Sequence, residues 1–126
     1  WLARRLKDIG VDVIDCSSGG LAGSATAARV KRYPGFQLPM AEAVRREAGM
    51  PTMAVGLILQ GPQAEQALAA GQADIIAVGR EALANPNWPL EALAEVEGKK
   101  PESYRRWPQQ AGWWLERRAG AMMESR

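Results

Sequence analysis

Histidine is missing from this 126-residue sequence, and cysteine occurs only once. A zinc site made of cysteine and histidine ligands is therefore excluded, and we expect no metal. A serine–histidine or cysteine–histidine nucleophile pair is excluded for the same reason. One cysteine cannot form a disulfide within the chain, and a reducing, cytoplasmic location fits this composition.

A strong charge of one sign is also missing, since the formal net charge is +2 and basic and acidic residues are interleaved. Nucleic-acid-binding proteins usually gather basic residues on one face, so we expect no nucleic-acid partner. No apolar run has the length of a membrane-spanning helix, and we expect no membrane partner. The hydrophobic fraction of 47% and charged fraction of 24% are typical of a globular domain.

Three short apolar runs predict β-strands because they are rich in β-branched residues and bounded by glycine or proline. They are VDVIDC (11–16), TMAVGLI (52–58) and ADIIAVG (73–79). Helical patterns alternate with them: WLARRLKDIG, LPMAEAVRREAG, PQAEQALAAG, a short turn, and PLEALAEVEG. Pro62 suits a first helical turn, and Gly49 and Gly71 suit helix C-termini. This alternation predicts an α/β fold with parallel strands and helical crossovers.

Two architectures fit this order, an open doubly wound sheet and part of a (β/α)8 barrel. A complete barrel needs about 250 residues, so three strands would form only the final portion of one. The segment WLARRLKDIG resembles the last turns of a helix. We therefore expect the sequence to be a piece of a longer protein.

Ligands gather at the carboxyl ends of the strands in both architectures. At these ends stand Ser17-Ser18-Gly19-Gly20, Gly56-Leu57 and Gly79-Arg80. Glycine lets the backbone approach a ligand closely, so amides of the two later segments could converge on one phosphate. The Arg80 guanidinium would add positive charge. The alternative is that these glycines only make turns and that Arg80 has no ligand.

The loop over residues 19–37 is far longer than a usual strand-to-helix connection, which favours a functional role. Its basic residues Arg29, Lys31 and Arg32 are interpreted as a solvated face. Cys16 is interpreted as a small buried residue and not as a reactive thiol. The tryptophans are interpreted as packing or interface residues: Trp88, Trp113 and Trp114.

Four segments together resemble the closing part of the old yellow enzyme family: VDVIDCSSGG, FQLPMAEAVRREAGMPTMAVGLI, ADIIAVGREALANPNWP and PESYRRWPQ. Members of this family are FMN-dependent ene-reductases on (β/α)8 TIM barrels. The sequence is most similar to their bacterial, thermophilic-like branch. The resemblance covers residues 1–115, with 116–126 as a C-terminal tail. It implies that residues 12–17, 52–57 and 74–79 are the sixth, seventh and eighth barrel strands.

The resemblance also implies a cofactor site. Backbone amides of Gly56, Gly79 and Arg80 would hold the FMN phosphate, and the Arg80 side chain would lie near the flavin. Arg106 would reach into a neighbouring subunit's active site, which implies a homo-oligomer formed through the C-terminal region. Arg105 competes for this role because the glycine expected before the tryptophan is missing. The substrate-binding histidine pair and the proton-donating tyrosine of the family have no counterpart, so we expect no catalytic residue here.

The main functional hypothesis follows from this resemblance. The complete protein would take hydride from NAD(P)H onto FMN and pass it to an activated alkene, while this segment alone is inactive and contributes the phosphate site. A second hypothesis is another phosphate-binding TIM-barrel enzyme. A third is a stand-alone partial barrel that serves as a binding or assembly module without catalysis, its sheet edges covered by self-association.

Overall fold

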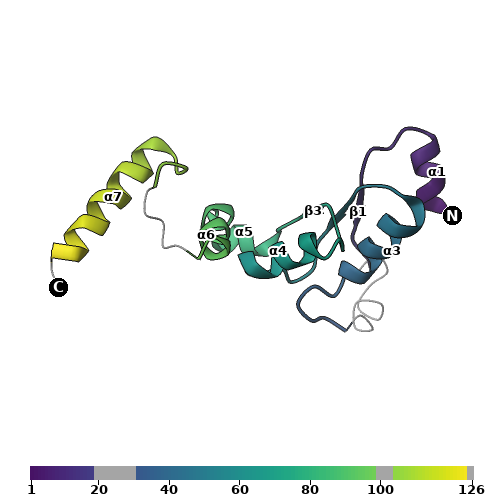
Figure 1. Cartoon of the computed structure of the whole chain (residues 1–126), viewed down its shortest axis with the longest axis horizontal. Coiled ribbons are helices and arrows are strands. Elements are labelled where there is room, and N and C mark those ends of the chain that lie inside the picture. The colour runs from purple at the N-terminus through teal and green to yellow at the C-terminus, as the bar shows by residue number, and fades with distance from the viewer. Residues whose placement is uncertain (19–30, 99–103, 125–126) are drawn as a thin grey trace.

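The computed structural model of the chain describes residues 1–18, 31–98 and 104–124 (Figure 1). Helices and strands alternate as the sequence predicts: α1 (Leu2–Asp8), β1 (Ile14–Cys16), α3 (Leu38–Ala48), β2 (Thr52–Ala54), α4 (Gly61–Ala69), β3 (Ile75–Ile76), α5 (Arg80–Ala84), α6 (Trp88–Val96) and α7 (Gln109–Glu124). The strands lie within the three predicted runs but cover only two or three residues of each. The remaining apolar residues of each run continue into loops at the strand ends.

The three strands form one parallel sheet in the order β1-β2-β3. Ala54 of β2 pairs with Cys16 of β1 on one side and with Ile76 of β3 on the other. The prediction of parallel strands is therefore confirmed. Because the strands are parallel, all three carboxyl ends lie at the same edge of the sheet.

The core lies between one face of this sheet and the helices α3 and α4. Alternate residues of a strand point to opposite faces. The core cluster takes its members from the strands, from both helices and from the adjoining loops: Cys16, Leu38, Ala41, Ala54, Ile58, Ala67 and Ala73. On the other face of the sheet stand Asp15, Met53 and Ile75, and Ile75 is 46% exposed. In the described ranges, α3 and α4 thus cover a single face.

The helix ends follow the predicted glycine and proline signals. Gly49 has a left-handed φ of 61° after α3, and its N–H donates to the Arg45 carbonyl at 3.0 Å. Gly71 has a φ of 71° two residues after α4, and Pro62 lies in the first turn of that helix. Both helix ends are therefore set by local sequence.

Helix α6 packs across the beginning of α4. A β-carbon on Gly61 would collide with the backbone of Ala92, so only glycine allows this approach. The Gly61 N–H donates to Glu95 Oε2 at 2.8 Å. From the first turn of α6, the Trp88 indole N–H donates to the Leu59 carbonyl at 2.9 Å. This contact fixes α6 against the loop between β2 and α4.

Helix α7 was not expected from the sequence, and Figure 1 shows it at the opposite end of the chain from α1. Its residues Trp113 and Trp114 are 47% and 65% exposed, so within the described structure they are not core residues. Arg117 stacks over the Trp113 ring at 3.9 Å. The expected boundary between residues 115 and 116 falls inside α7 and stays a prediction. No helix in the described ranges is long and apolar enough to cross a membrane.

Asp74 joins the beginnings of β2 and β3 to helix α3. Its carboxylate accepts hydrogen bonds from the Thr52 N–H at 2.9 Å and from Arg45 Nε at 3.0 Å. Its own N–H donates to the Thr52 carbonyl at 2.9 Å. The Thr52 N–H, followed by Arg45, holds the pKa of Asp74 below its ordinary value, although partial burial opposes this shift.

We expect Asp74→Asn to lower the free energy of unfolding by about 1 kcal/mol at neutral pH, because charged hydrogen bonds are lost. A carboxyl whose pKa is lowered by folding stabilises the protein above its unfolded pKa, and this contribution disappears as the pH falls through the folded value. In urea unfolding, the difference in the free energy of unfolding between Asp74→Asn and wild type should therefore become smaller below about pH 4. Glu65→Gln, an exposed change on α4, is the control. A difference independent of pH would contradict this account of Asp74.

Candidate functional site

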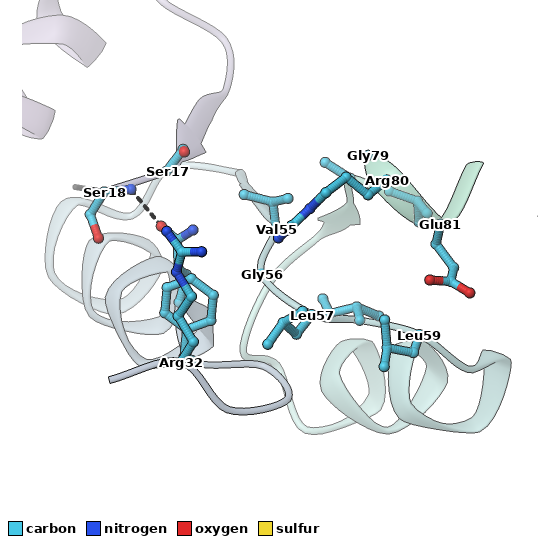
Figure 2. Close-up of a pocket in the computed structure, with 15 residues that line it drawn as sticks. Ser17, Ser18, Arg32, Val55, Gly56, Leu57, Leu59, Gly79, Arg80 and Glu81 are labelled. Carbon is cyan, nitrogen blue, oxygen red and sulfur yellow. Dashed lines mark hydrogen bonds between the residues drawn. The ribbon is translucent and has the colours of Figure 1, made fainter. Parts of the chain in front are cut away.

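A cavity of about 510 Å³ opens at the carboxyl edge of the sheet (Figure 2). Its wall is formed by residues after each strand and by the segment before α3: Ser17, Ser18, Arg32, Phe36, Gln37, residues 55–59 and residues 77–81. This volume is in the range of small-molecule binding sites. The cavity therefore lies where the parallel strands predict a ligand.

The structure brings three of the four predicted site residues together. Gly56, Gly79 and Arg80 all lie on the wall of this cavity. Arg106 does not lie on it, and its Nη1 is 3.6 Å from Glu97 Oε1 in an exposed ion pair. Its competitor Arg105 is exposed and is likewise not part of the wall.

The turn after β2 has an unusual backbone. Gly56 has a φ of 124°, and Leu57 has a φ of 53°, which is rare for a residue with a β-carbon. Such a conformation costs roughly 1–2 kcal/mol and must be held by its surroundings. A β-carbon on Gly56 would lie 2.9 Å from the Phe36 ring, and the Gly56 carbonyl accepts a hydrogen bond from Gly35 at 2.8 Å. The turn is thus packed against the segment before α3.

Two arginines extend into the cavity from opposite sides. Figure 2 shows Arg32 beside Ser18 on one side and Arg80 directed towards Val55 on the other. Within the described residues, neither guanidinium forms an ion pair. The carboxylate of Glu81 also lies on the wall, but Figure 2 shows it pointing away from Arg80. The cavity therefore has an excess of positive charge.

Arg32 is a wall residue that sequence reasoning missed. It was interpreted as part of a solvated loop face; the side chain is exposed, but it also lines the cavity. The hydrogen bond between the Gly35 N–H and the Gly56 carbonyl holds this segment beside β2. No signal in the sequence shows that pairing. Arg29, with the rest of residues 19–30 of the long loop, lies outside the described residues.

The end of β1 adds polar groups and a protected thiol. The Ser18 N–H donates to Oε1 of the buried Gln37, and Ser17 stands next to it on the wall. Cys16 is buried, which confirms its predicted place. Burial, and then the charge of Asp15, raises the pKa of the Cys16 thiol, so it stays protonated at neutral pH. These groups suit binding better than nucleophilic chemistry.

The arrangement is suited to holding an anion. A β-carbon on Gly79 would meet no atom within 4 Å, so there is open space above the end of β3. The guanidinium groups of Arg80 and Arg32 line the same cavity, and each could contact phosphate oxygens through several N–H donors. Among the described residues, no group of three histidine, cysteine or acidic side chains could hold a metal ion. The residues present thus fit a ligand with a phosphate group.

Comparison with known proteins shows clear relatives. The model of the NADH:flavin oxidoreductase / NADH oxidase family matches residues 2–98. The chain is 50% identical over 105 residues to an NADPH dehydrogenase of Geobacillus thermodenitrificans and 49% identical over 94 residues to one of a Geobacillus species. An NADPH dehydrogenase of Halalkalibacterium halodurans is 50% identical over 95 residues. These matches cover 82%, 75% and 75% of this chain but only 30%, 26% and 27% of the relatives, so the matched part spans less than a third of their length.

The two glycines on the wall should differ in their tolerance of a side chain. Gly56→Ala places a methyl group against Phe36 at a φ of 124°, and we expect it to lower the free energy of unfolding by about 1–3 kcal/mol. Gly79→Ala is the comparison, because its φ of −98° is negative and an added β-carbon would meet no atom within 4 Å, so we expect a smaller loss than for Gly56→Ala. Urea unfolding of both variants measures this. If both variants lose the same free energy of unfolding, the backbone of the turn after β2 does not specifically require glycine at position 56.

Proposed function

Since the chain belongs to the NADH:flavin oxidoreductase / NADH oxidase family, the family of old yellow enzyme, we propose that its cavity binds the phosphate end of FMN. Backbone amides of Gly56, Gly79 and Arg80 would contact the phosphate. The guanidinium groups of Arg80 and Arg32 would neutralise its charge. The observation that carries the proposal is that both glycine turns line one cavity together with two arginines that form no ion pair with any described residue.

We propose that β1, β2 and β3 correspond to the sixth, seventh and eighth strands of a TIM barrel. In a doubly wound sheet, helices cover both faces, whereas in a barrel they form only an outer ring. The one-sided cover by α3 and α4 favours the barrel. In that arrangement, Met53 and Ile75 on the uncovered face would point to the barrel interior.

For the complete protein, we propose an FMN-dependent oxidoreductase that uses NAD(P)H to reduce activated alkenes. Bound FMN would supply the hydride chemistry. The residues of this chain would bind the cofactor's phosphate and orient it, and we assign none of them a catalytic role. Relatives named NADPH dehydrogenase support NADPH as the reductant.

We propose that Arg106 acts at a contact with a neighbouring subunit. Its side chain is 66% exposed, and an exposed ion pair such as the one with Glu97 restrains it only weakly. The exposed Trp113 and Trp114 on α7 would supply apolar area for the same contact. This would give a homo-oligomer built through the C-terminal region.

Arg80→Ala should weaken FMN binding by about tenfold or more, since a charge-assisted hydrogen bond is lost. Flavin fluorescence titration measures the dissociation constant. Riboflavin, which lacks the phosphate, should lose less affinity than FMN. Arg46→Ala, an exposed change on α3, is the control and should not alter FMN affinity. A wild-type chain that binds no FMN, or an equal loss for riboflavin, would overturn the phosphate assignment.

Arg32→Ala tests the residue that sequence reasoning missed. Because Arg32 lies across the cavity from Arg80, we expect a loss of FMN affinity of about five- to tenfold that grows smaller at high salt. Lys31→Ala removes the same charge from the neighbouring position, which is not on the wall, and should have little effect. The same titration compares the two. Equal effects would mean that Arg32 acts only through net charge.

A further inference from the structure

The turn between β2 and α4 lines the cavity without the support of regular backbone pairing. It holds Leu57 at a φ of 53°, a conformation that the residue would seldom adopt alone. A strained turn keeps its shape only when other groups fix it. The side chains that contact this turn therefore decide whether its amides are in place before a ligand arrives.

Gln63, in the first turns of α4, contacts the turn with both ends of its side-chain amide. Its Nε2 donates to the Leu57 carbonyl at 3.1 Å, and its Oε1 accepts from the Leu59 N–H at 3.0 Å. A planar amide is the side-chain group that offers a donor and an acceptor fixed relative to each other. Gln63 thus encloses Ile58 between two hydrogen bonds, as a neighbouring strand would.

Two further hydrogen bonds hold the ends of the same turn. The Trp88 indole N–H donates to the Leu59 carbonyl at 2.9 Å, and the Gly35 N–H donates to the Gly56 carbonyl at 2.8 Å. Gln63 forms its hydrogen bonds with the backbone of Leu57 and Leu59, within the same turn. It is half-buried and is not part of the cavity wall. Its influence on a ligand must therefore pass through the backbone.

We propose that Gln63 is a positioning residue that preforms the phosphate-binding turn at residues 56–59. This rests on the proposed binding of FMN in the cavity. A turn that is already ordered loses less conformational freedom when the ligand binds, and affinity rises accordingly. FMN affinity therefore depends on Gln63, although the side chain does not touch the ligand.

Gln63→Glu provides a test with a chemical signature. The new carboxylate can still accept from the Leu59 N–H, but it cannot donate to the Leu57 carbonyl until it is protonated. At about pH 8, we expect FMN to bind about tenfold more weakly than to wild type. As the pH is lowered through the ordinary range of a glutamic acid, to about 4, the protonated acid restores the second bond, and the loss of FMN affinity should shrink. Gln63→Leu loses both bonds and should show the weakening at every pH.

Gln66→Glu is the matched control, because it makes the same charge change at an exposed site one turn along α4. Acidic groups near the turn, Glu95 on α6 and Glu81 on the cavity wall, are the same in every variant. Their titration and that of the FMN phosphate therefore cancel when each variant is compared with wild type at the same pH. The control should follow wild type throughout.

Hydrogen exchange of the chain without FMN supplies the second measurement. The Leu59 amide should exchange faster in Gln63→Leu than in wild type or the control. If wild type binds FMN but both Gln63 variants bind it equally well, the positioning role is wrong while the cofactor site stands. If wild type binds no FMN, the proposed function fails. The exchange rate of the Leu59 amide then decides by itself whether Gln63 holds the turn. If the Leu59 amide exchanges at the same rate in Gln63→Leu as in wild type, the role of Gln63 is overturned. If it exchanges faster in the variant, Gln63 orders the turn at residues 56–59.

Discussion

Strand β2 is hydrogen-bonded on both sides, and this pairing decides where the candidate site residues lie. Because β1 and β3 run parallel to it, the segments that follow the three strands meet at one edge, where the cavity opens. At the other edge, Asp74 binds the Thr52 backbone and Arg45. The interactions at one edge thus hold the strands in register, and the other edge places backbone segments and two arginines around the cavity.

The sequence predicted helices and strands well where the signals are local. Glycine at a helix end and proline in a first turn act within a few residues, and Gly49, Gly71 and Pro62 lie where expected. Strand length was overestimated because apolar runs report burial and not backbone pairing. Val55 and Val78 belong to these runs but line the cavity beyond the sheet. Helix α7 was missed because its residues 109–124 include two glycines, Gly112 and Gly120, which disfavour a helix interior.

Among the site residues too, those marked by a local sequence signal could be predicted, and those placed by a tertiary contact could not. Gly56, Gly79 and Arg80 could be selected from the sequence because each directly follows a predicted strand, and parallel strands place such positions together. The place of Arg32 depends on the Gly35–Gly56 hydrogen bond, and that of Gln63 depends on the path of a strained turn. Neither contact leaves a pattern in the sequence. The role of Arg106 depends on a neighbouring subunit and stays a prediction.

The close approach of α4 and α6 at Gly61 has a consequence for how this protein can change over evolutionary time. A side chain at position 61 would force α6 away from α4, and α6 carries the Trp88 indole that holds Leu59. The packing of two helices outside the cavity therefore restricts the shape of the cavity wall. Variation at Gly61 is therefore limited by a cavity that this residue does not line, and mutational drift in the α4–α6 pair is coupled to the shape of that cavity.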